Sequence, residues 1–381
     1  MKHKQTIGGQ LLLALFLAVN QNALANTTRY VNGLHGSDSN NCSSQQTACK
    51  TIGHAISLSA SGDSIMVAAA TYKENLTIPF NLTISGAAPA TIVDGRKAGA
   101  VVTIRNTSAH VSLSGLTIQN GSGSNLGGGG IYNAGVLTIT NTTVSGNQSF
   151  DIPYPGGGLG GGINNAGTLT LIQSTVSGNN TSRFRTGASA AGGGIYNSGN
   201  LTLTNSTING NTVLDFWPAN WTYGGGIANE NGTLQMNNST ISQNVTTYLT
   251  PFGTAYGFGS GLYNSGPRTA VVLQNSIFGS DPGGNCNGAL SSEGYNISGD
   301  NTCPLHGPGD MNNRDPKLGP LQNNGGPTQT MALLPGSPAI LAGNPSGCTD
   351  GRGHRLEIDQ RMHPRPDLGA CDMGAYEVKE E

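Results

Sequence analysis

Few residues in the central part of the chain have side chains suited to acid–base chemistry. Between residues 101 and 280 the only acids are Asp151, Asp215 and Glu230. Hydrolysis of a glycosidic bond needs a pair of carboxyl groups, and a calcium site needs several oxygen ligands. We expect Asp151 and Asp215 in loops and Glu230 in a turn, too far apart to serve either purpose. The sequence therefore favours binding over catalysis, and we expect no metal ion and no cofactor.

Charged residues are densest near the C-terminus. They are Asp310, Arg314, Asp315, Asp359, Arg361, Arg365 and Asp372. We expect structural ion pairs that close the end of the fold. A catalytic cluster or a calcium site is the alternative, although no ligand spacing diagnostic of calcium supports it.

Aromatic residues are concentrated in the segments between the repeats described below. These segments hold 11 of the 21 aromatic residues and both Trp. Exposed aromatic faces among polar groups suit sugar rings or protein partners, so we predict a ligand-binding surface here. The predicted residues are Tyr154, Phe184, Trp217, Trp221, Tyr223, Tyr248, Phe252 and Tyr256. The alternative is that these side chains, with Phe150, Phe216 and Phe258, only pack the loops against the rest of the fold.

The elements that would position these residues are sequence repeats. Five segments share the pattern Gly-Gly-Gly-Ile-x-Asn or a close variant, and they begin at Gly128, Gly160, Gly192, Gly224 and Gly259. The first three steps are 32 residues and the last is 35. A constant period of this length is typical of solenoid proteins. The leading apolar residues are Ile131, Ile163, Ile195, Ile227 and Leu262.

Each repeat contains three short segments with the alternation of β-strands. The second segment reads Leu201-Thr202-Leu203 in one repeat. A third follows around Val144, Val176, Ile208 and Ile241, with Gly and Asn at the corners between segments. This pattern predicts an all-β fold, a right-handed parallel β-helix. Residues 212 to 223, and the equivalent span of each repeat, are expected to be loops that leave the coils at one corner.

Asparagine recurs at one position of every repeat. We predict that these residues form a ladder of stacked side-chain amides, as parallel in-register strands allow. A polar binding stripe is the alternative. The positions are Asn133, Asn165, Asn197, Asn229 and Asn264.

Both ends of the solenoid need a cover, because open strand edges promote aggregation. Residues 51 to 60 have the apolar spacing of a helix that could lie across the first coil. After Gly279 the repeats give way to turn residues. We therefore divide the chain into a signal peptide (1–25), an N-terminal cap with the first coils (26–100), Gly- and Asn-rich repeats (101–281) and an irregular C-terminal capping region (282–381).

The N-terminus is typical of an exported protein. Basic Lys2 and Lys4 precede a short apolar run from Leu11 to Val19, and Ala23 to Ala25 form a small-residue cleavage site. The run is too short to span a bilayer, and no second long apolar segment follows. We expect a secreted or cell-surface protein with no transmembrane segment in the mature chain.

Six Cys fit an oxidising compartment. Their order suggests pairs Cys42–Cys49, Cys286–Cys303 and Cys348–Cys371, although six Cys allow 15 pairings and the sequence leaves them open. Their wide spacing argues against a zinc site. Charged residues make up only 10% of the chain and the net charge is −2. We expect no nucleic-acid partner, because nucleic acid needs a basic surface.

Three stretches of the sequence resemble known families. YVNGLHGSDSNNCSSQQTACKTIGHAI and GDSIMVAAATYKENLTI resemble the start of bacterial pectin-lyase-like surface proteins, and the GGGIYN repeats are loosely similar to those of polymorphic outer-membrane proteins. The C-terminal run from DPKLGPLQNNGGPTQTMALLPGSPAI to CDMGAYE resembles the choice-of-anchor Q domain. Met331, Leu341 and Met362 depart from that pattern. The resemblance implies a surface or secreted β-helix and brings no activity with it.

These observations lead to one functional expectation and one alternative. We expect a non-enzymatic exported protein used in adhesion, glycan binding or cell-envelope structure, with a polysaccharide or a cell-surface protein as partner. The alternative is a polysaccharide lyase or glycoside hydrolase with an atypical active site. The scarcity of acids in the repeats favours the first.

Overall fold

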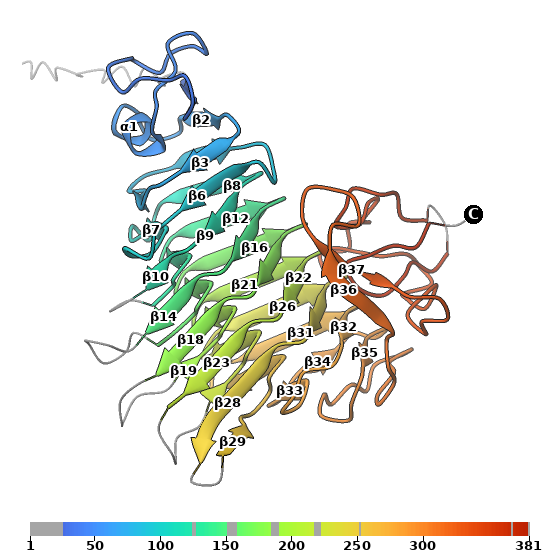
Figure 1. Cartoon of the computed structure of the whole chain (residues 1–381). Helices are drawn as coiled ribbons and strands as arrows, with labels where there is room; N and C mark the ends of the chain where they lie inside the picture. Colours follow the sequence, from blue (N-terminus) through green and yellow to red (C-terminus); the bar gives the residue numbers. More distant parts are fainter. Residues whose placement is uncertain are drawn as a thin grey trace, which may run out of the picture.

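The chain folds as a right-handed parallel β-helix, as the repeats predict (Figure 1). The computed structural model describes residues 26–123, 127–150, 158–183, 190–216, 222–250, 253–366 and 369–379. The predicted signal peptide lies outside these residues and stays a prediction. Among the described residues, no helix has the length and hydropathy needed to span a membrane.

Three large parallel sheets in the described residues form the walls of the solenoid. The ten-stranded sheet contains β1 (Thr28–Val31), β2 (Ser64–Val67), β5 (Leu82–Ser85), β8 (His110–Ser114), β12 (Val136–Thr140), β16 (Thr168–Ile172), β21 (Asn200–Thr204), β26 (Thr233–Asn237), β31 (Ala270–Gln274) and β34 (Ser291–Ser292). The nine-stranded sheet contains β3 (Ala70–Tyr72), β6 (Thr91–Asp94), β9 (Thr117–Gln119), β13 (Thr143–Ser145), β17 (Thr175–Ser177), β22 (Thr207–Asn209), β27 (Thr240–Ser242), β32 (Ile277–Phe278) and β35 (Ile297–Ser298). The eight-stranded sheet contains β4 (Leu76–Thr77), β7 (Val102–Ile104), β11 (Ile131–Asn133), β15 (Ile163–Asn165), β20 (Ile195–Asn197), β25 (Ile227–Glu230), β30 (Leu262–Ser265) and β33 (Cys286–Asn287).

The leading apolar residues of the repeats stack inside the solenoid. Ile131, Ile163, Ile195 and Ile227 are register partners in successive coils, and each is 0% exposed. Their alternate neighbours point outward, because successive side chains of a strand lie on opposite faces. The prediction of a common interior position is confirmed.

The predicted asparagine ladder is also confirmed. The amides of Asn133, Asn165, Asn197 and Asn229 each donate to the side-chain oxygen of the next residue, ending at Asn264, over 2.8, 2.7, 2.6 and 2.7 Å. A buried amide needs such partners, since an unpaired one costs ~1–3 kcal/mol. In-register stacking supplies them in every coil.

A second ladder escaped the sequence analysis. Asn147, Asn179, Asn211 and Asn244 stack at another corner, with amide-to-oxygen distances of 3.0, 2.9 and 2.9 Å. The last rung is not Asn but Asp281, whose carboxylate accepts from the Asn244 amide at 3.1 Å and from the Asn244 backbone N–H at 2.6 Å. A third corner carries hydroxyl groups, each of which accepts a backbone N–H of the preceding coil. These belong to Ser174, Ser206, Ser239 and Ser276.

The structure corrects the prediction of simple loops after the second ladder. In each repeat the chain first continues as a fourth strand, and these strands form a six-stranded sheet, parallel except for its last pair. Its strands are β10 (Ser122–Gly123), β14 (Gln148–Phe150), β18 (Asn180–Arg183), β23 (Thr212–Asp215), β28 (Val245–Thr250) and β29 (Gly253–Tyr256). Just before the chain enters the next coil, it forms a smaller sheet of β19 (Ala190–Ala191) and β24 (Thr222–Tyr223). We call these two sheets the side lobe.

The N-terminal cap agrees with the sequence. Helix α1 (Ile52–Ser57) buries Ile52, Ala55 and Ile56 at the end of the solenoid (Figure 1). Thr51 caps it by accepting the His54 N–H, and the Glu74 carboxylate accepts the N–H groups of Ile52 and Gly53 at 2.9 and 2.7 Å.

The three disulfides are those suggested by sequence order. They join Cys42 to Cys49, Cys286 to Cys303 and Cys348 to Cys371. Disulfides persist in oxidising environments, so they indicate an extracellular protein.

The C-terminal region is only partly the predicted end cap. The strands β33 to β35 complete the last coil, but the chain then forms a hairpin of β36 (Leu318–Gln322) and β37 (Thr330–Leu333) and runs back along the flank of the solenoid (Figure 1). There it binds the corner between the ten- and nine-stranded sheets. Outward amides at this corner contact its backbone over 2.8 to 2.9 Å. They are Gln173, Asn205, Asn238 and Asn275.

Part of the charged cluster stabilises this docked region, whereas Asp310 holds the last coil by accepting the Ser292 hydroxyl at 2.6 Å and the Asn296 N–H at 2.8 Å. Arg361 pairs with Asp359 at 2.7 Å and Arg365 with Glu377 at 2.5 Å, all four being buried. Arg365 also donates to Asn205 of the solenoid at 2.8 Å. Glu377 and Asn205 were not among the residues singled out, because their partners are distant in sequence.

We predict that the Asn ladder contributes strongly to stability. Asn197→Ala removes the ladder partner of the Asn165 amide and of the Asn229 oxygen, and should lower the free energy of unfolding by ~2–3 kcal/mol. Chemical denaturation measures this. Asn200→Ala, at an exposed position of the same repeat, is the control and should change stability by less than ~0.5 kcal/mol. Equal effects of the two substitutions would contradict the ladder's role.

We also predict that Asp281 makes stability depend on pH. Burial raises the pKa of Asp281 to about 7, although hydrogen bonds from Asn244 act in the opposite direction. Because this pKa lies above the ordinary value of 3.8, the contribution of Asp281 is fully present below about pH 4 and is lost as the pH rises through 7. Asp281→Asn restores the amide found in the other rungs. It should melt at a higher temperature than the wild type at pH 8, and the gap should shrink by pH 5. A pH-independent gap would contradict this account.

Candidate functional site

The predicted aromatic surface is only partly within the described residues. Tyr154, Phe184, Trp217, Trp221 and Phe252 lie outside them. Tyr223 lies on β24, Tyr248 on β28 and Tyr256 on β29. In the β28–β29 hairpin, Tyr248 pairs with Ala255 and Tyr256 with Thr247, so the two rings point to opposite faces. The ligand-binding role of Tyr223, Tyr248 and Tyr256 stays a prediction.

The outer face of the eight-stranded sheet carries an aromatic row that the sequence analysis missed. Tyr132, Asn164, Tyr196, Ala228 and Tyr263 are register partners in five successive coils. The three tyrosines are half-buried, whereas the small residues between them are only 6% and 0% exposed. Neighbouring side chains thus cover the small residues. The signal was present in the repeats, as the residue after the leading Ile points outward.

Tyr223 extends this row toward the side lobe. Its ring stacks on that of Tyr263, with centroids 4.3 Å apart and planes at 29°. The ring of Phe258 also lies near Tyr223, with centroids 6.4 Å apart and planes at 22°. Phe258 is 38% exposed and is the bridge partner of Tyr223 in the next coil. Three roughly parallel rings therefore lie where the side lobe meets the eight-stranded sheet.

A carboxyl group lies beside these rings. Glu230, at the end of β25, accepts the hydroxyl of Tyr196 at 3.0 Å. Burial raises the pKa of Glu230, with the Tyr196 hydrogen bond opposing it. Burial raises the pKa of Tyr223 to about 12, and electrostatic interactions with Tyr263 and Glu230 act in the same direction. The Tyr223 hydroxyl is therefore protonated at neutral pH and can donate to a ligand. We call Tyr196, Tyr223, Glu230, Phe258 and Tyr263 the ring cluster.

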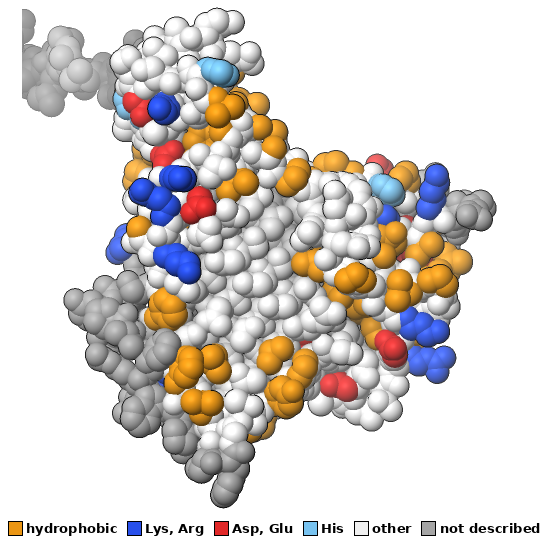
Figure 2. All heavy atoms as spheres, viewed as in Figure 1, with side chains coloured by type: hydrophobic (Ala, Val, Ile, Leu, Met, Phe, Trp, Pro, Cys, Tyr) orange, Lys and Arg blue, Asp and Glu red, His pale blue; other side chains and the backbone are white. Residues whose placement is uncertain are grey.

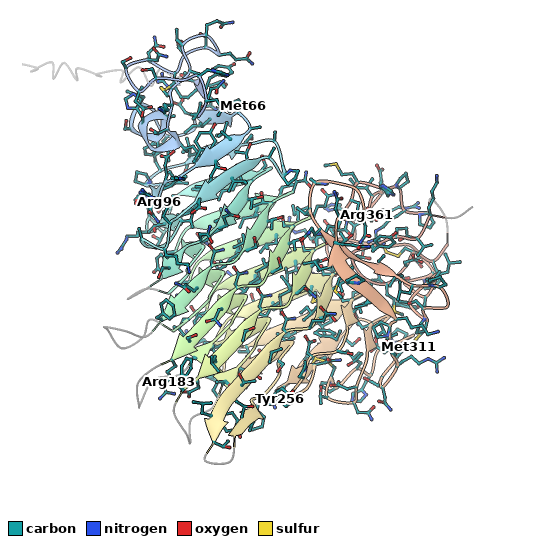
Figure 3. All side chains as sticks on the ribbon, in the orientation of Figure 1. Met66, Arg96, Arg183, Tyr256, Met311 and Arg361 are labelled. Carbon is teal, nitrogen blue, oxygen red and sulfur yellow. A yellow bond between two sulfur atoms is a disulfide. The ribbon has the colours of Figure 1, made fainter. Side chains whose placement is uncertain are left out.

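The structure removes Asp215 from the candidates for surface chemistry. The sequence placed it in a loop, but it lies inside the side lobe on β23 and pairs with Arg183 of β18 at 3.3 Å. Their side chains are 0% and 1% exposed. Figure 3 labels Arg183 on the lobe, far from Arg361 of the C-terminal region. Asp151, the third acid of the repeats, lies outside the described residues.

The ring cluster is better suited to binding than to bond cleavage. In residues 190–216, 222–250 and 253–280 the only acids are Asp215 and Glu230, and Asp215 is buried. Glu230 thus has no second carboxylate in these residues with which to cleave a glycosidic bond or hold calcium. Stacked rings beside hydroxyl groups and one carboxylate offer apolar contact and hydrogen bonds together.

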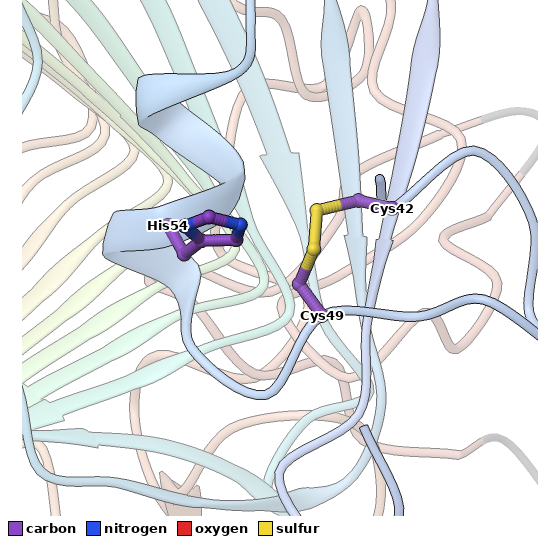
Figure 4. Close-up of side chains that lie close together, drawn as sticks. All are labelled: Cys42, Cys49 and His54. Carbon is purple, nitrogen blue, oxygen red and sulfur yellow. A yellow bond between two sulfur atoms is a disulfide. The ribbon is translucent and has the colours of Figure 1, made fainter. Parts of the chain in front are cut away.

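Two other places in the described residues are weaker candidates. Cys42, Cys49 and His54 lie within 4.8 Å of one another (Figure 4), a distance compatible with a metal site. The two sulfur atoms are joined in a disulfide, so neither is a thiolate ligand. A hollow of about 350 Å³ lies near the N-terminus, between Tyr30, Met66 and Ala87. Its lining carries no charged side chain and no stacked rings.

No family model and no curated protein matches the sequence of this chain, but several solved structures are similar to it. A crystal structure of the pectate lyase Pel9A is similar with a TM-score of 0.39 and 16% identity, over 93% of this chain and 98% of that chain. A crystal structure of a pectin methylesterase mutant in complex with hexasaccharide IV is similar with a TM-score of 0.29 and 12% identity, over 64% of this chain and 79% of that chain. These likenesses concern the overall fold alone, and the resemblance to the choice-of-anchor Q domain stays a prediction.

Proposed function

We propose that this is an exported, non-enzymatic protein that binds a polysaccharide through the ring cluster. The observation that carries the proposal is the stack of Phe258, Tyr223 and Tyr263 beside Glu230. Aromatic rings bind the apolar faces of sugars, while hydroxyl and carboxylate groups exchange hydrogen bonds with sugar hydroxyls. The three disulfides support a protein that works outside the cell.

The row of outward tyrosines supports a chain-like ligand. Tyr132, Tyr196 and Tyr263 recur in every second coil, or about every 9.6 Å at the usual strand spacing of ~4.8 Å. A linear polysaccharide lying parallel to the solenoid axis could contact several of them. Trp217 and Trp221 belong to the segment just before Tyr223 and are proposed to contribute to the same surface.

A cell-surface protein is the second candidate partner, which would make the chain an adhesin. Phe150, Leu214 and Tyr256 share the outer face of the six-stranded sheet with Phe216, which is 38% exposed. Tyr256 is 58% exposed. Figure 2 shows hydrophobic side chains gathered at this end of the molecule. A lyase or hydrolase finds less support, because Glu230 lacks a second carboxylate among its described neighbours.

We predict that glycan binding depends on the ring cluster. A glycan array on residues 26–381 should identify a bound polysaccharide. Tyr223→Ala and Tyr263→Ala should each weaken its binding about tenfold, or ~1.4 kcal/mol, through the lost ring contact. The double variant that combines Trp217→Ala with Trp221→Ala should abolish binding with little change in thermal stability. Isothermal titration calorimetry and thermal melting measure these effects.

Tyr30 is half-buried and lines the N-terminal hollow. Tyr30→Ala is therefore the matched control and should bind the polysaccharide as tightly as the wild type. Stable variants of Tyr223 and Tyr263 that bind as tightly as the wild type would place the site elsewhere. Early unfolding of the Trp pair would identify those residues as packing residues. If no glycan on the array binds but a protein binds the apolar face of the six-stranded sheet, the result supports the adhesin alternative.

A further inference from the structure

We infer that the ring cluster selects neutral, hydroxyl-rich polysaccharides over those built from uronic acids, and that Glu230 determines this choice. The inference rests on the proposed glycan-binding function and specifies its ligand. It derives from the position of one carboxylate among aromatic rings, with no cation among the described residues to offset its charge.

Glu230 is fixed in place by its neighbours. It follows Asn229, whose amide is held in the first ladder by Asn264 at 2.7 Å, so the backbone that carries Glu230 is tied into the coil. The side chain points outward, next to Ala228, and its Oε2 accepts the Tyr196 hydroxyl. Among the described residues no donor contacts Oε1, which leaves that oxygen to accept from a ligand.

No positive charge in the described part of the chain compensates this carboxylate. Glu230 makes no ion pair there, and burial is the main influence on its pKa. Arg268, in the turn between β30 and β31, is exposed and does not pair with it. A uronate placed on Tyr223 and Tyr263 would bring a second negative charge close to Glu230 in a partly dry site, where repulsion is strong.

A neutral sugar is not repelled by Glu230 and can form hydrogen bonds with it. Its hydroxyl groups can donate to the free oxygen, and hydrogen bonds to an ionised acceptor are stronger than neutral ones. The phenol hydroxyls of Tyr223 and Tyr263 can donate to ring and hydroxyl oxygens of the same sugar. Ring contact then supplies affinity, whereas Glu230 supplies discrimination by disfavouring acidic sugars.

The test compares two hexasaccharides of opposite character by calorimetry at low salt. One is a hexamer of β-1,4-linked glucose, and the other is a hexamer of α-1,4-linked galacturonate. The wild-type chain should bind the glucose hexamer at least about tenfold more tightly than the galacturonate hexamer. Glu230→Gln keeps an acceptor for Tyr196 but removes the charge. It should reduce the preference to less than about threefold, mainly through tighter galacturonate binding.

Glu293→Gln, at an exposed position in the last coil, is the matched control and should keep the wild-type preference. Circular dichroism and thermal melting verify that each variant is folded. Equal wild-type affinity for the two hexamers, or a preference unchanged by Glu230→Gln, would overturn the inference while leaving the proposed function intact. A wild-type chain that binds neither hexamer would count against both.

Discussion

The structure depends on the stacking of corner residues in register. Asn133 and its equivalents are buried, and a buried amide is tolerated only when its hydrogen bonds are made. The Asn of the next coil supplies them, and this holds only if every coil places Asn at the same corner. The requirement fixes the place of Asn in the coil, although the number of residues between two rungs can be 32 or 35. A coil whose backbone followed a different path would displace its Asn. The hydrogen bonds of that Asn to the coils before and after it would then be lost.

The proposed function depends on the side chains that the same strands direct outward. A strand that stacks Ile195 and Asn197 inward must stack Tyr196 outward, because successive side chains alternate. The alignment of the outward tyrosines is thus a consequence of the ladder, although Asn164 and Ala228 occupy the same position in two coils. The side lobe arises at one corner of each coil for the same reason, which brings Tyr223 against Tyr263. The C-terminal region binds the outward amides of another corner, which the ladders hold in a regular line.

The sequence predicted the features that repeat and missed those that depend on single contacts. The interior Ile residues and the first ladder were evident from the period, and α1 from apolar spacing. The fourth strand was taken for a loop because Thr212 to Asp215 contain one buried apolar residue, Val213, and a charge. The burial of Asp215 is accompanied by an ion pair with Arg183, which lies one coil away. The docking of the C-terminal region was beyond prediction, since Asn205 and Arg365 are 160 residues apart.

The most direct test of the account is a crystal structure of residues 26–381 with a bound neutral oligosaccharide. We expect sugar rings to stack on Tyr223 and Tyr263, a sugar hydroxyl to donate to Glu230, and the chain to run parallel to the solenoid axis over Tyr196. A ligand bound instead in the hollow beside Tyr30 and Met66, or on the face opposite the ring cluster, would contradict the account.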